Sequence, residues 1–255
     1  MAQSKPSIVI IPGSFSPDYF YFDTVDKLRE YGYEAIVKNL PSASRLPPEK
    51  AATLYEDADY FRGVAEKLAD EGKDVVFVTH SYGGVVGSEA ARDVLKTQRQ
   101  AAGKTGGIVR IVYVTSVVPP VGTSLRGLMG DLLPSYLEVE GDFMRHVDFE
   151  ATARRTFSQI PFEKGVEYAK KMSRHSAPSF TGELTYPAYE HVPVSWVFCE
   201  KDLILVPEFQ TSVIAAIEKD SGNKVHVIRL DADHCPNIGK PIELANAIKD
   251  ALVGA

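Results

Sequence analysis

Short apolar runs rich in β-branched residues alternate with longer helix-like segments along most of the chain. We expect strands at residues 8–11, 35–38, 75–78, 108–115, 194–199 and 225–230. Helical periodicity lies between them, at residues 19–31, 48–71, 84–97, 207–219 and 241–253. Strands that alternate with helices build βαβ units, in which successive strands run parallel. The sequence therefore predicts an α/β fold with a mostly parallel central sheet flanked by helices.

This alternation stops between about residues 119 and 189, where helical pattern, aromatic residues and scattered Pro and Gly occur without a convincing strand. We interpret residues 121–189 as a small, mainly helical cap inserted into one α/β core, made of residues 1–120 and 190–255. Large apolar side chains at helical spacing more often pack together than contact a ligand. We expect packing roles for Phe143, Phe149, Phe157, Phe162, Tyr168 and Met172. The Gly-rich, polar residues 98–107 predict a mobile surface loop.

Length and composition fit one globular core rather than a nucleic-acid-binding or membrane protein. A chain of 255 residues with 44% hydrophobic residues can bury one substantial core. The net charge of −6 and the scattered Lys and Arg argue against a phosphate-binding surface, because such a surface needs clustered cations. No run approaches the roughly 18 apolar residues of a membrane span, and residues 1–6 lack a signal-peptide pattern. We therefore expect a cytoplasmic protein that binds neither nucleic acid nor membrane.

The strand at residues 75–78 ends in a pattern typical of a nucleophilic serine. Ser81 follows at a sharp strand-to-helix turn, where the positions two before and two after the serine need small side chains. Gly83 fits this G-x-S-x-G pattern, whereas Thr79 departs from it at the first position. A plain strand-to-helix connection is the alternative, so the catalytic interpretation depends on partners for Ser81.

A serine hydroxyl needs a histidine base and a carboxylate that orients the base, and in this architecture the acid precedes the histidine. Asp202, just after the strand at residues 194–199, is the candidate acid, with Glu200 as the less favoured alternative. His234, in the loop after the last strand, is the candidate base. The other histidines lie beside the serine, inside a strand, or in or next to the cap: His80, His226, His146, His175 and His191.

Four further residues lie close to these candidates in the sequence. Asp231 and Asp233 are expected to cap or solvate the turn around His234, because neighbouring side chains of a loop usually point apart. Cys199 and Cys235 are the only cysteines, too few for a disulfide framework in a chain of this length. We interpret both as thiols that line a pocket.

Acyl transfer also needs two backbone N–H groups that stabilise the oxyanion. One comes from the residue after the nucleophile, here Tyr82, and the other from the loop after an early strand. Gly13 follows the first strand and lets the backbone approach a substrate closely. The N–H of Ser14 or of Phe15 is the candidate second donor, and the sequence leaves this choice open. A simple Gly turn is the alternative interpretation of this loop.

Together these segments resemble the α/β-hydrolase superfamily over nearly the whole chain, and more narrowly its branch of plant methylesterases and hydroxynitrile lyases. The resemblance is carried by residues 12–15, 80–84, 199–210 and 233–236. Its most distinctive part is Asp202 followed, at residues 207–210, by Pro-Glu-Phe-Gln. The resemblance implies a triad of Ser81, Asp202 and His234, and a small, mainly helical cap over the pocket.

Two positions distinguish the activities within this branch. The esterases commonly have His-Gly where this chain has Pro12-Gly13, so the glycine is kept. The lyases carry a threonine in place of Gly13 and a lysine after the catalytic histidine, where this chain has Cys235. Because no cation stands there to stabilise a departing cyanide, hydrolysis is favoured over cyanohydrin cleavage.

The sequence thus predicts a serine hydrolase that cleaves a carboxylic ester of a small, largely apolar molecule through an acyl-enzyme. No metal or organic cofactor is expected. Lactone hydrolysis or C–C bond cleavage at the same triad is an alternative, as is a ligand receptor that retains the triad. The substrate is not identified, and a homodimer is left open.

Overall fold

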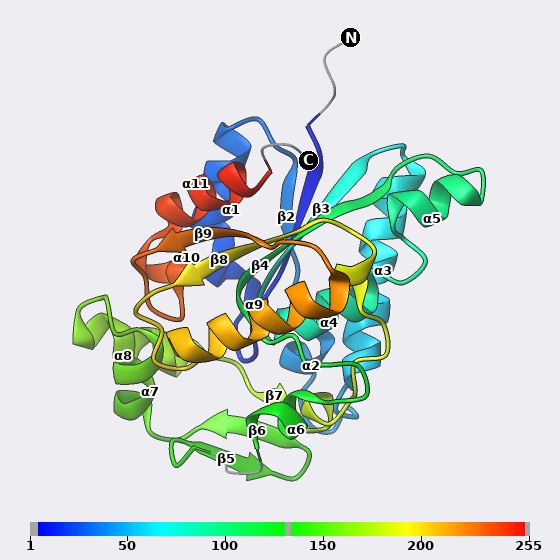
Figure 1. Cartoon of the computed structure of the whole chain (residues 1–255). Helices are drawn as coiled ribbons and strands as arrows, with labels where there is room; N and C mark the ends of the chain where they lie inside the picture. Colours follow the sequence, from blue (N-terminus) through cyan, green and yellow to red (C-terminus); the bar gives the residue numbers. More distant parts are fainter. Residues whose placement is uncertain (1–4, 131–133, 253–255) are drawn as a thin grey trace.

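The computed structural model describes residues 5–130 and 134–252, and within them a six-stranded sheet forms the centre of the molecule (Figure 1). The strand order is β2-β1-β3-β4-β8-β9, and all neighbouring pairs are parallel. The strands are β1 Ser7–Ile11, β2 Ala35–Val37, β3 Asp74–Ser81, β4 Gly107–Ser116, β8 Val194–Cys199 and β9 His226–Leu230. The predicted α/β fold with a mostly parallel sheet is confirmed.

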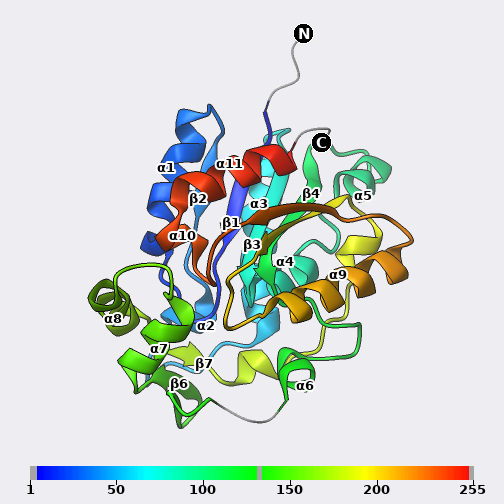
Figure 2. The same cartoon turned by 60° about the vertical axis from the view of Figure 1, so that its left-hand side comes forward.

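Helices cover both faces of this sheet (Figure 2). In α1 and α11 the buried residues pack on one face, and those of α3, α4 and α9 pack on the other. The helices are α1 Phe22–Glu30, α2 Pro41–Ser44, α3 Leu54–Asp70, α4 Gly83–Ala90, α5 Lys96–Ala101, α6 Leu125–Met129, α7 Phe149–Thr156, α8 Phe162–Lys171, α9 Pro207–Ser221, α10 Pro236–Gly239 and α11 Pro241–Ala251. The short 3₁₀ helices are η1 Asp18–Tyr21, η2 Pro178–Phe180 and η3 Ala188–Glu190.

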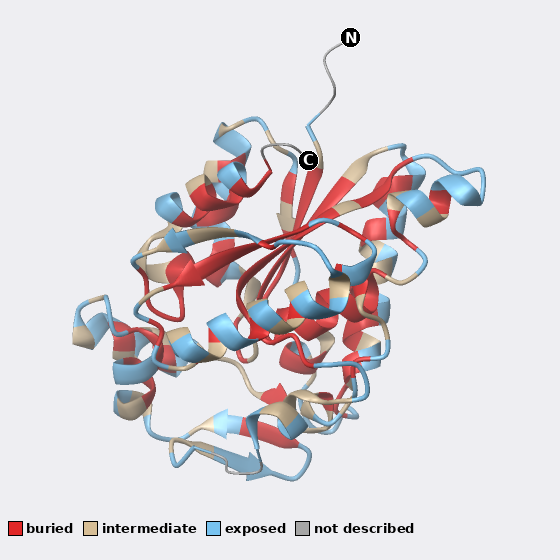
Figure 3. Cartoon of the chain, in the orientation of Figure 1, coloured by how far each residue is buried: buried red, intermediate tan, exposed pale blue. Residues whose placement is uncertain are grey.

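The continuous apolar runs of the strands follow from this layered arrangement. Successive strand residues point to opposite faces, so Val75 and Phe77 pack beneath α3 and α4, whereas Val76 and Val78 pack beneath α1 and α11. All four are buried, and Figure 3 shows the inner strands of the sheet almost entirely in the colour of buried residues. A strand covered on both faces needs apolar residues at every position, which is why the sequence signal was strong.

Several helix boundaries differ from those predicted. The helix expected from residue 48 begins at Leu54, because Thr53 caps it and bonds with Glu56 in both directions. The helix expected at residues 84–97 ends at Ala90, and a separate α5 occupies the first part of the predicted loop at residues 98–107. Arg99 anchors α5 through an ion pair with Asp70. Residue 253, the predicted end of the last helix, lies outside the described residues.

The segment predicted as the cap contains helices α6, α7 and α8, as expected, but the expectation that it holds no strand is wrong. An antiparallel sheet of order β5-β6-β7 is formed by Leu137–Glu140, Phe143–His146 and His175–Ser176. Gly141, with φ of 62°, opens the two-residue turn between β5 and β6. These strands are short and the outer one is largely exposed, so they lack the apolar runs that marked the central strands. Among the described residues, no helix is both long and apolar enough to cross a bilayer.

Candidate active site

Ser81 lies at the carboxyl end of β3, where the chain turns directly into α4. Its φ of 52° is in the left-handed region, a strained conformation that the nucleophile turn of this architecture requires. A Cβ on Gly83 would lie 2.5 Å from the carbonyl oxygen of Ile11, so only glycine fits there. Thr79 is accommodated by Gly87, where a Cβ would lie 2.5 Å from the Thr79 methyl group. The departure from G-x-S-x-G is therefore compensated within α4.

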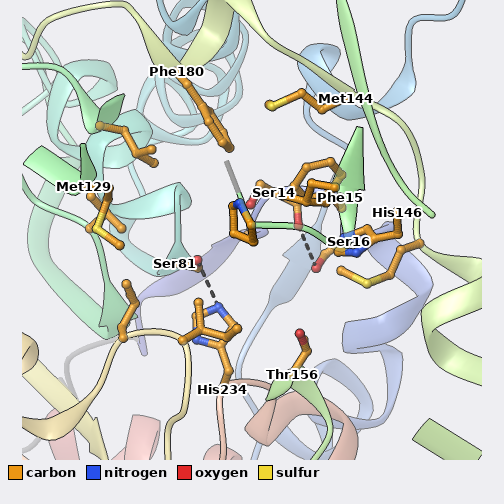
Figure 4. Close-up of a pocket in the computed structure, with 18 of the residues that line it drawn as sticks. Ser14, Phe15, Ser16, Ser81, Met129, Met144, His146, Thr156, Phe180 and His234 are labelled. Atoms are coloured by element: carbon orange, nitrogen blue, oxygen red, sulfur yellow. Dashed lines mark hydrogen bonds between the residues drawn. The ribbon is translucent and has the colours of Figure 1, made fainter. Parts of the chain in front are cut away.

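The structure brings Ser81, His234 and Asp202 together in one buried line of hydrogen bonds. Oγ of Ser81 lies 3.1 Å from Nε2 of His234, and Nδ1 of His234 lies 2.8 Å from Oδ2 of Asp202. Figure 4 shows Ser81 and His234 facing each other at the base of the cavity. These distances match those of a nucleophile, its base and the group that orients the base.

Asp202 is completely buried and bonded at both carboxylate oxygens. Oδ1 accepts the N–H groups of Ile204 and Leu205 at 2.7 and 2.9 Å, and Oδ2 also accepts the Thr115 hydroxyl. Burial acts to raise the pKa of Asp202, but the charge and hydrogen bond of His234 and these donors outweigh it, so the pKa is lowered. An ionised Asp202 only accepts, so Nδ1 of His234 carries the proton and Nε2 is the acceptor for the serine hydroxyl.

The loop after β1 lies against the same cavity, with Ser14 and Phe15 among the lining residues. Phe15 has φ of 60°, and both of its backbone groups bond to the segment after α8. Its N–H donates to Nδ1 of His175 at 3.4 Å, and its carbonyl accepts the N–H of Ser173 at 2.9 Å. Tyr82, the other candidate donor residue, is fully buried at the start of α4, and its hydroxyl donates to Asp57.

A cavity of about 370 Å³ opens above Ser81, with most of its wall supplied by residues between β4 and β8 (Figure 4). The wall is mainly apolar and includes three methionines, Met129, Met144 and Met172. Met172 packs against the buried core, as predicted, and also contributes to the cavity wall. The five aromatic residues predicted to pack are not among the described lining residues: Phe143, Phe149, Phe157, Phe162 and Tyr168. No group of His, Cys, Asp and Glu suited to a metal ion is present within residues 5–130 and 134–252.

The acids next to the triad have structural roles. Glu200 is partly exposed and pairs with Arg229 at 3.4 Å, as a rim residue would. Asp231 is exposed near Lys240. Asp233 instead is only 2% exposed. It caps the turn, as expected, by accepting the N–H of Cys235 at 3.1 Å.

The two cysteines differ. Cys235 lines the cavity, as predicted, but Cys199 is fully buried and is not among the described lining residues, so the prediction is wrong for it. Cys199 ends β8, and its backbone groups bond to Gln210 of α9. Burial raises the pKa of both thiols well above the ordinary value.

Sequence reasoning missed several polar residues that support the site. Thr115, near the end of β4, belongs to no motif of the sequence, yet its hydroxyl donates to the candidate acid. His175 and Tyr21 bond to the loop after β1, His175 from 160 residues further along the chain and Tyr21 from only eight residues past Gly13. The N–H of Gln159, in the loop after α7, donates to Asp233 at 2.8 Å. No local pattern identifies Thr115, His175 or Gln159, since their roles arise from contacts between segments that are distant in sequence.

Comparison with known proteins identifies the family. Residues 8–247 match the model of the alpha/beta hydrolase family. The chain is 33% identical to a probable hydrolase, R7, of Phoma sp. over 247 residues, which cover 97% of this chain and 98% of that protein. A pyrethroid hydrolase from Sphingobium faniae has a TM-score of 0.73 at 19% identity, covering 98% of this chain and 99% of its own. A methylesterase from Arabidopsis, MES16, has a TM-score of 0.74 at 17% identity, with coverages of 98% and 100%.

The chain therefore belongs to the alpha/beta hydrolase family, as its resemblance predicted. At these identities the two solved structures establish the shared fold. One of them is a plant methylesterase, from the branch that the sequence resembles.

Proposed function

We propose that this protein is a carboxylic ester hydrolase with Ser81 as its nucleophile. The observation that carries the proposal is the line of hydrogen bonds from Asp202 through His234 to Ser81, which ends at a largely apolar cavity. Oγ attacks the ester carbonyl carbon while Nε2 of His234 takes its proton. The alcohol leaves with that proton, and water, activated by the same histidine, then releases the acid from the acyl-enzyme.

The oxyanion of this reaction would be held by the N–H groups of Tyr82 and Ser14. The N–H of Phe15 is less suitable because it already donates to His175, which holds it toward the cap. Ser14 lines the cavity beside Ser81, and Tyr82 starts α4, whose N-terminal end favours a developing negative charge. Two fixed backbone donors would then lie on the reacting side of the serine.

The surroundings of Gly13 and Cys235 favour hydrolysis over a reaction that releases cyanide. A Cβ on Gly13 would lie 3.1 Å from both Nδ1 of His80 and Cβ of Ser81, so a threonine would crowd the nucleophile. Cys235 lines the cavity beside His234 as a neutral thiol, because burial raises its pKa. A neutral thiol gives a leaving anion no charge stabilisation.

The cavity favours a small, largely apolar ester. Its wall consists mainly of aliphatic, methionine and aromatic side chains, so binding would derive chiefly from burial of apolar surface. The structural neighbours named as a pyrethroid hydrolase and a methylesterase support ester cleavage on this fold.

The test is Ser81→Ala, measured on a panel of aryl esters, methyl esters, lactones and β-diketones. We expect kcat on the best ester to fall by about a thousandfold or more, because the nucleophile is lost. Ser195→Ala is the matched control, since Ser195 is also buried but lies in β8 and is not among the described residues of the cavity wall. Full ester turnover by Ser81→Ala would refute the proposal. Products formed by the wild type only from lactones or only from diketones would assign lactone hydrolysis or C–C bond cleavage in place of ester hydrolysis.

A further inference from the structure

A chain of buried hydrogen bonds runs behind Ser81 and joins the loop after β1 to the loop of His234. The N–H of Gly13 donates to Oη of Tyr21 at 3.0 Å. The same oxygen lies 2.6 Å from Nδ1 of His80, and Nε2 of His80 lies 2.7 Å from the carbonyl oxygen of His234. Tyr21 and His80 are 1% and 3% exposed, so water does not compete for these groups.

The donor and the acceptor of every hydrogen bond in this network follow from the groups at its two ends. The carbonyl of His234 can only accept, so Nε2 of His80 carries a proton. Nδ1 of a neutral imidazole is then an acceptor, and the Tyr21 hydroxyl donates to it while accepting the N–H of Gly13. Burial lowers the pKa of His80 to about 3 and raises that of Tyr21, so neither changes protonation near neutral pH.

Three members of this hydrogen-bond network adjoin groups of the proposed mechanism in the sequence. Gly13 precedes Ser14, whose N–H is the proposed second oxyanion donor. His80 precedes Ser81, and the carbonyl at the far end belongs to His234 itself. The three segments come from different parts of the sheet edge, so their relative positions depend on contacts between them. Small displacements of catalytic groups cost large factors in rate, because the reacting atoms must be aligned before the step.

We propose that Tyr21 and His80 are positioning residues that hold the loop after β1 and the loop of His234 in register around Ser81. The Tyr21 hydroxyl is the better probe of this role, because Tyr21 is not among the described residues that line the cavity, whereas His80 is. Loss of that hydroxyl leaves the Gly13 N–H and Nδ1 of His80 without partners. This inference rests on the proposed function for its rate measurement.

The first experiment compares Tyr21→Phe with Tyr113→Phe. Both tyrosines are buried, and the hydroxyl of Tyr113 bonds to Ser88 at 2.8 Å, away from the cavity wall. For Tyr21→Phe we expect kcat to fall roughly 10- to 100-fold with KM changed by less than about threefold, and affinity for a boronic acid inhibitor to fall in parallel. Tyr113→Phe should keep kcat within about twofold. Equal effects in the two variants, or an unchanged kcat in Tyr21→Phe, would overturn the inference.

A second measurement does not depend on turnover. In wild-type protein with ¹⁵N-labelled histidine, His80 should show the Nε2–H tautomer without titration between about pH 5 and 9. Titration of His80 or the opposite tautomer would overturn the inference even if Tyr21→Phe failed to fold.

If the wild type cleaved no ester, the proposed function would fail. The labelling rate of Ser81 by a fluorophosphonate, compared between the same variants, would then decide whether Tyr21 positions the site.

Discussion

The two sides of the cavity are built on different principles. On the sheet side, the polar groups are buried and hydrogen-bonded. The carboxylate of Asp202, for example, accepts hydrogen bonds from Thr115, His234 and two backbone N–H groups. On the cap side, the wall is mainly apolar and includes unbranched methionines such as Met129, which is 44% exposed. Hydrogen bonds fix positions closely, whereas flexible apolar side chains adapt to different shapes. The sheet side is therefore suited to the reaction and the cap side to selecting the substrate.

The cap side is nevertheless bonded to the sheet side at two loops. Phe15, in the loop after β1, bonds through its N–H and carbonyl to His175 and Ser173. Asp233, next to the candidate base, accepts the N–H of Gln159 from the loop after α7. Each contact joins a cap segment to a loop that carries a proposed catalytic group. The segments that form the cavity wall and the loops that carry the proposed catalytic groups are thus physically connected.

The largest expected effect is on the sheet side. Asp202→Asn keeps the shape of the side chain but removes the charge that fixes the tautomer of His234. We expect kcat to fall about a thousandfold or more, because Nε2 of His234 would no longer be held as the acceptor for Ser81. Steady-state kinetics on the best ester measure this loss. Glu200→Gln, at the alternative acid, is the control and should keep kcat within about threefold. A larger loss of kcat in Glu200→Gln than in Asp202→Asn would instead assign the orienting carboxylate to Glu200.

The same contrast explains what the sequence could predict. Strands buried on both faces must be apolar throughout, and the turn at Ser81 leaves room only for glycine at Gly83, so both are visible as local patterns. Asp202 and His234 follow predicted strands, whose carboxyl ends meet at one edge of a parallel sheet. The fold and the three candidate residues were therefore accessible without coordinates.

The remaining parts of the site depend on contacts between segments that are distant in sequence. The β5–β6 hairpin has strands of only four residues, several of them charged, so it gives no apolar run. The proposed preference for Ser14 over Phe15 depends on a bond from Phe15 to His175, 160 residues further along the chain. Packing of this kind leaves no periodic signal, so it could not be read from one sequence.

The second effect concerns the stability of the core beneath Tyr82. Asp57 of α3 is buried and accepts the hydroxyl of Tyr82 and the N–H of Ser42. Burial raises its pKa to about 6, above the usual value of an aspartic acid. The folded state therefore binds this proton more tightly, so its stabilising contribution is complete below about pH 4 and is lost as the pH rises to about 6.

Asp57→Asn should remove this dependence on pH. We expect the free energy of unfolding of the wild type, relative to the variant, to fall by on the order of 2 kcal/mol between pH 4 and pH 7. Urea unfolding at each pH measures the difference. Asp59→Asn is the control, because the side chain of Asp59 lies in the same helix but is 67% exposed. A constant difference across this range would show that Asp57 does not titrate as a buried acid.

The third effect comes from separating the cap from the loop after β1. His175→Leu removes the acceptor for the N–H of Phe15, and we expect kcat to fall about tenfold as this loop loses a fixed partner. His175→Gln offers a side-chain oxygen to the same N–H and should recover part of the loss. The ratio of kcat between the two variants is the measurement. Equal kcat values for His175→Leu and His175→Gln would mean that the bond to Phe15 does not help to position the loop after β1.

The smallest effect is on the cap wall, at Met129→Ala. Met129 lines the cavity and is partly exposed, so its truncation removes apolar contact without leaving a buried hole. Half of a methionine side chain corresponds to roughly 1 kcal/mol of apolar burial, which predicts a rise in KM of about fivefold for long-chain esters. For short esters that do not reach Met129, KM and kcat should stay unchanged. Val147→Ala is the control, since Val147 is similarly exposed and is not among the described lining residues. A fall in kcat for short esters would contradict the division of roles, because it would place Met129 among the groups that act on the reaction itself.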